Sequence, residues 1–273
     1  MVLFCLVANP TFAIEVHVPS EALSIQRAVD MANEGDTIVI DDGIYLENIV
    51  ITKSLTLHAK NDLEKTILTA KDNKKSILTF LGTTGGVVSG LHFKGTRRSG
   101  VHIKKSKDIL ITGNKFTDSY NGIFLDHSEK IIVEDNLSTK NFNGINLEYT
   151  KSSKIIGNSA INNKEKGIIL LFSDLNTVKN NIANENYWNG ITLWSSLGNV
   201  VENNEAYNNT YGIVLTSSSG NTIRGNKTMR RLYFIWPVAL IYFSILFYLI
   251  ERKVFLFYFR SLKGSKMAPN ETR

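Results

Sequence analysis

The sequence has little cysteine, histidine or methionine. Its single cysteine, Cys5, lies in an apolar N-terminal segment, so a disulfide framework and a cysteine-based zinc site are both excluded. Of the five histidines, only His102 and His127 lie in the regular part of the chain, at non-equivalent positions. No methionine occurs between Met31 and Met229, although thioether sulfur is a preferred ligand of Cu(I). A two-histidine copper site is the one metal hypothesis that remains, and we expect no bound metal or other cofactor.

The main body of the chain also lacks an excess of basic residues. The formal net charge is +6, yet residues 14–229 contain 23 Lys and Arg against 23 Asp and Glu. Residues 230–273 contain eight basic and two acidic residues, which surround an apolar segment. Nucleic-acid-binding domains instead concentrate basic residues on the folded body. No nucleic-acid partner is therefore expected, and the charge distribution indicates a membrane.

The central part of the chain is an internal repeat. Six glycines are separated by 22, 22, 23, 23 and 22 residues: Gly100, Gly122, Gly144, Gly167, Gly190 and Gly212. Each glycine is followed by aliphatic residues at the first position and again two positions later. A serine or threonine stands at the sixth position, valine or isoleucine at the eleventh, and asparagine at the fourteenth. Such a recurring period is typical of a solenoid.

Each copy has the pattern of short strands. Apolar residues alternate at a spacing of two, and no copy contains a ten-residue helical pattern. Leucine-rich repeats place leucines in a denser motif. We therefore predict an all-β fold, a right-handed parallel β-helix over residues 37–229 with about eight or nine coils stacked ~4.8 Å apart.

The asparagines are predicted to hold the coils together. An amide side chain both donates and accepts hydrogen bonds, so identical residues on successive coils can form a ladder. The ladder residues are Asn114, Asn136, Asn158, Asn181, Asn204 and Asn226. A second column of this kind comprises Ser119, Asn141, Asn163, Asn186 and Asn209. The repeat glycine is expected to provide either a positive φ or a close approach of the backbone.

The N-terminal residues predict a leader and a cap. Residues 1–13 have the apolar run and the small residue before the cleavage site that end a signal peptide, although a basic start is absent. Residues 14–36 are predicted to form a strand and then an amphipathic helix from Ser20 to Asn33, with Ser20 as its N-cap. This helix would cover the open end of the solenoid, where backbone groups and core would otherwise meet water.

The C-terminal residues predict a membrane anchor. Leu232–Ile250 is a run of 19 residues without a charge, which is long enough to span a bilayer as a helix. We predict a transmembrane helix with basic flanks over residues 230–253 and a basic tail over residues 254–273. More basic residues follow the span than precede it, which predicts a cytoplasmic tail and an extracytoplasmic solenoid, periplasmic or at the cell surface.

Several motifs resemble the NosD-type proteins. They are SIQRAVDMANEGDTIVI (residues 24–40), GIYLENIVI (residues 43–51) and the repeated NGIxL, S-x-x-N-x-I and N-T-I-R-G-N units. The resemblance extends over residues 14–228. It implies an extracytoplasmic β-helix of the carbohydrate-binding and sugar-hydrolysis repeat class, within the pectin-lyase-like fold. It also implies an accessory role, because NosD-type proteins assist copper-site maturation of nitrous oxide reductase beside an ABC transporter. Relatives on this fold include mannuronan C5-epimerases, lyases and hydrolases.

Candidate catalytic residues lie on the strand that follows each repeat glycine. The first and third residues after glycine are expected to point inward and the second and fourth outward. Asp126 and Glu148 would then be neighbours on adjacent coils, with Lys104, His127 and Tyr149 around them. Paired carboxylates serve retaining glycosidases, whereas lyases and epimerases need a cation, a base and an acid. The alternative is a solvated charged face.

Candidate ligand-binding residues are aromatic or basic. They are Trp194, Tyr149, Phe172, Phe124, Lys105, Arg97 and Arg98. Aromatic rings can stack on sugars, and the basic residues could meet an acidic polysaccharide. The aromatic residues could equally pack against a loop or a partner, and the basic ones could form a solvated turn.

The sequence thus predicts a membrane-anchored extracytoplasmic β-helix. We expect a NosD-like accessory or binding protein that engages a polysaccharide, or a membrane protein such as a transporter, on the exposed face of the GIxL strands. The first alternative is a polysaccharide lyase, C5-epimerase or glycosidase that acts on the same face. The second alternative is a structural rod that holds a partner off the membrane.

Overall fold

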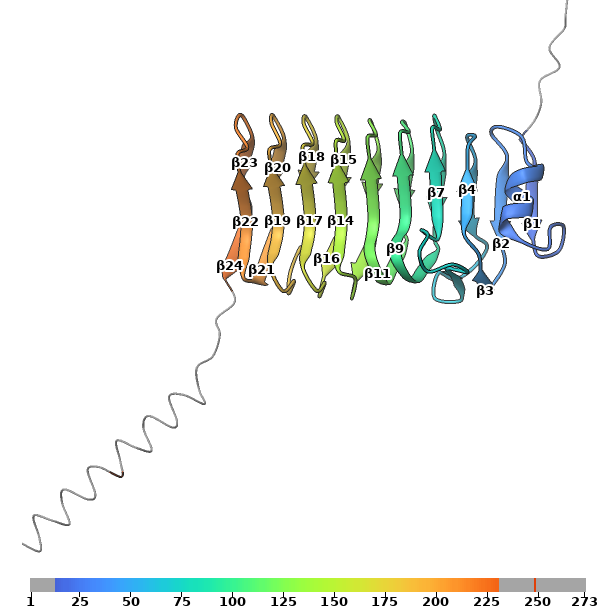
Figure 1. Ribbon diagram of the computed structural model, residues 1–273, viewed down its shortest axis with the longest axis horizontal. Helices are drawn as coiled ribbons and strands as arrows, with labels where there is room; N and C mark the ends of the chain where they lie inside the picture. Colours follow the sequence, from blue (N-terminus) through green and yellow to red (C-terminus); the bar gives the residue numbers. More distant parts are fainter. Residues whose placement is uncertain (1–12, 231–247, 249–273) are drawn as a thin grey trace, which may run out of the picture. The chain divides into compact units, whose positions relative to one another are not determined.

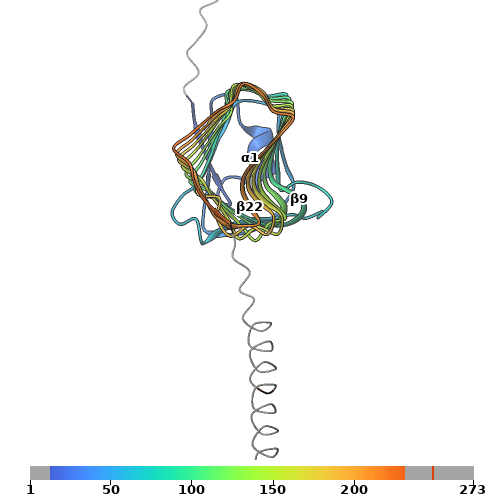
Figure 2. The same cartoon turned by 90° about the vertical axis from the view of Figure 1, so that its left-hand side faces the viewer.

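The computed structural model describes residues 13–230 and residue 248. Within residues 13–230, parallel strands wind into a right-handed solenoid, and each regular coil contributes to three faces (Figure 1). Viewed along the solenoid axis, successive coils superimpose (Figure 2). The prediction of an all-β parallel β-helix is confirmed.

The first face has one strand from each coil. Its ten strands, in spatial order, are β1 (Glu15–Val18), β2 (Thr37–Ile40), β5 (Thr56–Ala59), β8 (Val87–Ser89), β10 (Leu110–Thr112), β12 (Ile132–Glu134), β15 (Lys154–Ile156), β18 (Thr177–Lys179), β20 (Val200–Glu202) and β23 (Thr222–Arg224). The prediction of eight or nine coils refers to residues 37–229. Nine of these strands begin within that range, and β1 lies before it. The described part of the chain therefore contains about one coil more than the sequence predicts.

The second and third faces share two long strands, β9 (His92–Lys104) and β11 (Lys115–Asp126), which run around the corner between them. The second face consists of the first parts of these strands and of β3 (Gly43–Leu46), β6 (Thr66–Thr69), β13 (Leu137–Thr139), β16 (Ser159–Ile161), β21 (Glu205–Asn209) and β24 (Lys227–Arg230). The third face consists of their last parts and of β4 (Ile49–Ile51), β7 (Leu78–Leu81), β14 (Asn143–Glu148), β17 (Lys166–Leu171), β19 (Asn189–Trp194) and β22 (Tyr211–Thr216).

The helix α1 (Ile25–Met31) lies at the N-terminal end of the solenoid (Figure 1). Its buried residues Ile25, Ala28 and Val29 belong to the main core. The predicted helix from Ser20 to Asn33 is wrong at both ends. The backbone N–H groups of residues 21 and 22 bond to His17 in a turn, and the Ser24 hydroxyl accepts the hydrogen bond from Arg27 that caps the helix. Ala32 is extended, which ends it.

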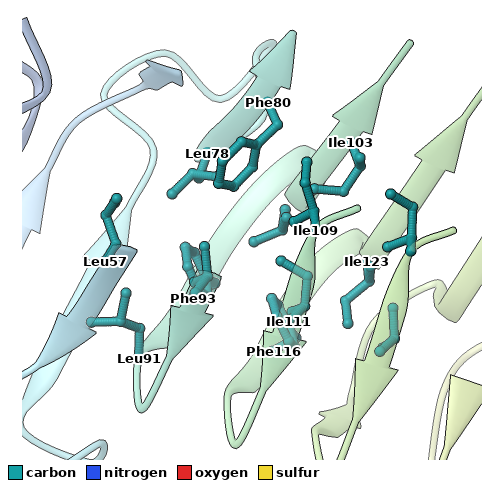
Figure 3. Packing of buried hydrophobic residues seen from close by; sticks show 14 of the residues in the cluster. Leu57, Leu78, Phe80, Leu91, Phe93, Ile103, Ile109, Ile111, Phe116 and Ile123 are labelled. Carbon is teal, nitrogen blue, oxygen red and sulfur yellow. The ribbon is translucent and has the colours of Figure 1, made fainter. Parts of the chain in front are cut away.

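The core includes the first and third residues after the repeat glycines. Ile123 and Leu125 are completely buried, as are their equivalents as far as Ile191 and Leu193, so the inward positions predicted from the alternation are confirmed; on the last coil, Leu215 is 40% exposed. Phenylalanines fill the first coils, where the rings of Phe93 and Phe116 stack with centroids 5.1 Å apart (Figure 3). Each such buried side chain stabilises the fold by about 1.5–3 kcal/mol.

The repeat glycines are required by the close approach of neighbouring coils. None of the six has a positive φ. A β-carbon built on Gly190 would lie 2.7 Å from the carbonyl oxygen of Gly212 and 2.7 Å from the β-carbon of Ala206. On Gly122 it would lie 2.7 Å from the carbonyl oxygen of Gly144. Any side chain at these positions would push two coils apart. Of the two predicted roles of the glycine, close approach of the backbone is therefore correct and a positive φ is not.

Asparagine ladders connect the coils along the axis. In the first ladder, the Asn158 backbone N–H donates to Asn181 Oδ1 at 2.9 Å, and Asn158 Nδ2 donates to Asn181 Oδ1 and to the carbonyl oxygen of Val133. Asn158 Oδ1 accepts two equivalent bonds from Asn136. The second predicted column has bonds of the same form. These side chains are buried, and their amide groups satisfy backbone groups that the turns leave unpaired.

The structure contains a third ladder that the sequence analysis did not identify. Its residues follow the regular serine or threonine by three positions on the last coils: Ser153, Asn176, Asn199 and Asn221. The serines and threonines themselves form a further chain: except at Thr150, each hydroxyl accepts a hydrogen bond from the backbone N–H of the equivalent residue on the preceding coil. Buried polar side chains therefore fix the register of the regular coils.

The two 23-residue repeats carry their additional residue at one corner. Asn141 is followed by Gly144 after three positions, whereas Asn163 is followed by Gly167 after four. This corner joins the second face to the third. The asparagine ladder before the corner and the hydroxyl chain after it both continue in register, so the additional residue is accommodated locally.

Three predicted segments fall almost entirely outside the described residues. The predicted signal peptide, residues 1–13, does so except for Ala13, and the predicted transmembrane helix over residues 230–253 and the tail over residues 254–273 do so except for residues 230 and 248. In the part of the chain that the structure describes, no helix has the length and apolar character needed to cross a bilayer.

Asn158→Ala should lower the free energy of unfolding by about 2–4 kcal/mol, because it leaves several buried backbone and side-chain groups without partners. Urea unfolding followed by circular dichroism measures this change. Asn226→Ala is the matched control, since Asn226 is only half-buried and the groups it releases can reach water. Equal losses in the two variants would contradict the ladder's role.

Candidate functional site

A long groove runs along the third face of the solenoid. Its volume is about 980 Å³. It extends from β4 and β7 at the N-terminal end to β22 near the C-terminal end. A groove of this size and length can hold several units of an extended polymer.

The floor and walls of the groove come from fixed positions of the repeat. The residue before each repeat glycine and the second residue after it form the floor, where Asn121, Asn143, Asn146 and Asn189 are all buried. The residue two before the glycine, from Arg98 to Trp188, and the fourth residue after it, from Glu148 to Thr216, are more exposed and form the walls. The first wall stands at the corner where β11 changes register between Ser119 and Asn121.

The walls present aromatic rings to the groove. Tyr120 and Phe142 stand on the first wall with stacked rings, 4.8 Å apart and 10° from parallel. Trp188 continues this wall two coils further on, and Trp194 belongs to the other wall. All four are at least a third exposed. Exposed rings held by a rigid sheet are suitable surfaces for stacking a ligand.

The floor presents hydrogen-bond acceptors to the groove. The Nδ2 groups of Asn143, Asn146 and Asn189 donate to Asn121 Oδ1 at 3.2 Å, Glu148 Oε1 at 3.1 Å and Thr192 Oγ1 at 2.9 Å. The three Oδ1 atoms are buried and have no hydrogen-bond partner among the described residues. An unpaired buried carbonyl oxygen costs roughly 1–3 kcal/mol. A ligand with hydroxyl groups would remove this cost.

Two histidines face one carboxylate at the edge of the groove. Asp126 Oδ1 lies 2.5 Å from His127 Nδ1, and Asp126 Oδ2 lies 3.5 Å from His102 Nε2. His102 lines the groove and stacks on Phe124, with ring centroids 4.8 Å apart. Burial lowers the pKa of His102, and Asp126 acts in the opposite direction. His102 is therefore a neutral imidazole near neutral pH, which is the state of a general base.

The structure brings the predicted catalytic residues onto one edge, but not into one pocket. Asp126 pairs with Glu148 on one neighbouring strand and with Lys104 on the other. Of these five residues, only Glu148 lines the groove. His127 and Tyr149 lie one position further on, at a turn, and stack with ring centroids 4.6 Å apart.

The predicted ligand-binding residues divide in the same way. Trp194, Phe124 and Arg98 line the groove, whereas the other four do not. Tyr149, Phe172 and Lys105 occupy the turn after the strand, where the backbone has φ of 49°, 48° and 51°. This left-handed conformation directs them away from the sheet; Tyr149 and Phe172 stack with each other there, with centroids 5.1 Å apart. Arg97 is exposed beside Arg98.

Sequence reasoning missed the first wall and most of the floor. The signal was the two residues before the repeat glycine, which read Tyr-Asn, Phe-Asn and Trp-Asn in three of the six copies: residues 120–121, 142–143 and 188–189. An aromatic residue beside an asparagine at constant register indicates a wall next to a floor. The search for exposed residues after the glycine did not include these positions.

Comparisons with known proteins identify the family and the fold. A model of the family described as "Periplasmic copper-binding protein (NosD)" matches residues 29–227. No curated protein matches the chain significantly.

Among solved structures, the chain is similar to ORF18 of Geobacillus virus E2, with a TM-score of 0.56, 11% identity, and 75% of this chain and 57% of that chain covered. It is similar to the Dettilon tailspike protein, with a TM-score of 0.55, 14% identity, and coverage of 79% and 62%. It is also similar to the periplasmic alginate epimerase AlgG, with a TM-score of 0.54, 16% identity, and coverage of 78% and 68%. The chain thus spans less than two thirds of the length of the first two. At these identities the likeness establishes the β-helix fold alone.

The family description implies copper, and the described residues do not fit a copper site. Within residues 13–230, no group of three or more His, Cys, Asp or Glu side chains is arranged to hold a metal ion. His102 and His127 approach the same carboxylate, but they do so from different positions of the coil, and their rings stack on Phe124 and Tyr149.

Lowering the pH should destabilise the fold through His102. Burial lowers its pKa in the native state, so below about pH 6.5 the unfolded chain binds more protons than the native chain and the free energy of unfolding falls. His102→Gln should reduce this fall, measured by urea unfolding at about pH 7.5 and pH 5.5. His92→Gln should do the same, since burial also lowers the pKa of His92. Variants that keep the pH dependence of the unchanged protein would contradict this assignment.

Proposed function

We propose, on the premise that the chain belongs to the NosD family of periplasmic β-helical proteins, that it binds a polysaccharide outside the cytoplasm along the groove of the third face. The observation that carries this proposal is the combination of exposed aromatic walls with buried, unpaired amide oxygens on the floor. The length of the groove supports a polymeric ligand over a small molecule.

Sugars match both features of the groove. The C–H face of a pyranose ring packs on an aromatic ring, and its hydroxyl groups donate hydrogen bonds to carbonyl oxygens. Asn143 and Asn146 offer such oxygens on one coil, and Asn189 offers one two coils further on. Because the ladders hold the floor asparagines on a fixed backbone, little conformational freedom is lost on binding.

The location proposed for the protein rests on the sequence. The leader, residues 1–13, and the apolar run Leu232–Ile250 support a solenoid that is anchored to the membrane from its extracytoplasmic side, with a basic cytoplasmic tail. An anchored binding protein would act beside a membrane partner, for example a transporter.

A second candidate function is cleavage or epimerisation of an acidic polysaccharide. The observation that favours it is the neutral His102 in the groove beside Asp126. In a lyase reaction, His102 would take the proton from the carbon next to the uronate carboxyl group. A carbon–carbon double bond would form as the bond to the next sugar breaks, and the departing oxygen would take a proton from solvent. Of the other predicted catalytic residues, Glu148 also lines the groove.

Trp188→Ala and Trp194→Ala should each weaken polysaccharide binding about tenfold, because each removes a stacking surface. The measurement is a glycan array with the full-length chain, followed by calorimetry on the polymer bound. Tyr187→Ala is the matched control, since Tyr187 is 59% exposed next to Trp188 but does not line the groove. Absence of any glycan binding would refute the proposal and favour the structural rod.

The second candidate predicts product formation. Incubation of the full-length chain with a uronate polymer should then generate unsaturated or reducing ends, and His102→Gln should slow their formation at least about a hundredfold. Glu148→Gln tests the carboxylate in the same way. Tight binding without new ends would exclude cleavage and retain the binding function.

A further inference from the structure

We infer that the polysaccharide is acidic and that its negative groups bind at the N-terminal end of the groove, against Lys74, Lys75 and Arg98. This inference rests on the proposed function and adds the class of ligand and its placement. We call these three residues the cationic end.

The charges that line the groove leave the cationic end uncompensated. The lining contains six charged residues. Lys166 is paired with Glu165 at 2.6 Å, and Glu148 accepts a hydrogen bond from Asn146. In the described part of the chain, no ion pair involves Lys74, Lys75 or Arg98. Three unpaired cations in one concave surface attract an anionic ligand.

The backbone that carries the cationic end is held in place. Asn48 Nδ2 donates to the carbonyl oxygens of Asp72 and Ser76 at 3.2 and 2.9 Å, and Asn48 Oδ1 accepts from the Asp72 N–H. Thr96 Oγ1 donates to the carbonyl oxygen of Lys75 at 2.6 Å. The segment from Asp72 to Ser76 is thus attached to Asn48, directly before β4, and to strand β9, and its lysines extend from a fixed support.

Arg98 is fixed to the same segment and its charge reaches the floor. Its Nε donates to the carbonyl oxygen of Lys74 at 3.3 Å. Burial is the main cause of the low pKa of His102, Asp126 opposes it, and the positive charges of Lys104 and Arg98 lower it further.

The opposite end of the groove has no charge. Beyond Lys166, the described lining residues are aromatic, aliphatic or neutral polar: Ile169, Leu171, Trp188, Asn189, Thr192, Trp194, Val214 and Thr216. An acidic glycan therefore meets cations at one end and stacking surfaces at the other. The cationic end can form ion pairs with an acidic glycan. A neutral glucan has no charged groups to pair with it, so the charge gives such a ligand no preference for the N-terminal end.

The test measures binding of the full-length chain to a polyuronate, a sulfated glycan, a neutral glucan and polyglutamate at low and at physiological salt. The variant carries Lys74→Gln, Lys75→Gln and Arg98→Gln. The matched control carries Lys94→Gln, Lys130→Gln and Lys154→Gln, which remove the same charge from exposed positions outside the groove. At low salt we expect the variant to bind the acidic glycans about tenfold more weakly and the control to bind them normally. At physiological salt the loss in the variant should be smaller, because salt screens the charges.

The four ligands separate the possible outcomes. Preference for the polyuronate or for the sulfated glycan identifies which anionic group is recognised, and either supports the inference. Acidic-glycan binding that is equally tight in the variant and the unchanged protein, or neutral-glucan binding as tight as acidic-glycan binding, overturns the inference but leaves polysaccharide binding in place. Polyglutamate binding as tight as glycan binding, unaffected by Trp194→Ala, shows attraction to charge alone and overturns it. Failure to bind any glycan refutes the proposed function as well.

Discussion

The structure depends on the constant, close spacing of its coils. Parallel strands on adjacent coils lie ~4.8 Å apart, and this spacing is maintained inside by aliphatic side chains and at the turns by buried amides. Each rung of a ladder pairs backbone groups that a turn cannot pair by itself. A repeat glycine such as Gly190 allows the same spacing where two backbones nearly touch. Core, turns and glycines therefore satisfy one geometric requirement.

The same constraint separates residues that fold the chain from residues that can bind a ligand. Positions that face the core or the ladders repeat the same residue types on every coil, because every coil has the same neighbours. Positions at the groove are free of this requirement and change from Tyr120 to Glu165 to Trp188 along one wall. Variation along a column thus indicates the functional face, whereas constancy indicates structure.

Because structural positions recur at constant spacing, much of the fold could be predicted from the sequence. Less of the site could be predicted, because its residues vary from coil to coil. The period, the inward positions and two ladders follow from residues that recur at constant spacing. The limits of α1 do not follow from any repeated pattern, because the side chain of Ser24 and a turn before it decide where the helix begins. Tyr149 and Phe172 were expected beside Trp194, but the backbone turns at their position with φ near 49°, and alternation along a strand contains no information about where the strand ends. The contribution of Lys74 and Lys75 to the groove depends on contacts between distant segments, which no local pattern reports.

The additional residue of the two longer repeats has an evolutionary consequence. It lies at the corner that supports the first wall, between interactions that remain in register on both sides. A change of chain length there alters the outline of the groove and leaves these hydrogen bonds between the coils in place. Insertions and deletions at this corner therefore allow related solenoids to diverge in the ligands they recognise without a change in the coils. The same corner is a suitable position at which to engineer a new specificity.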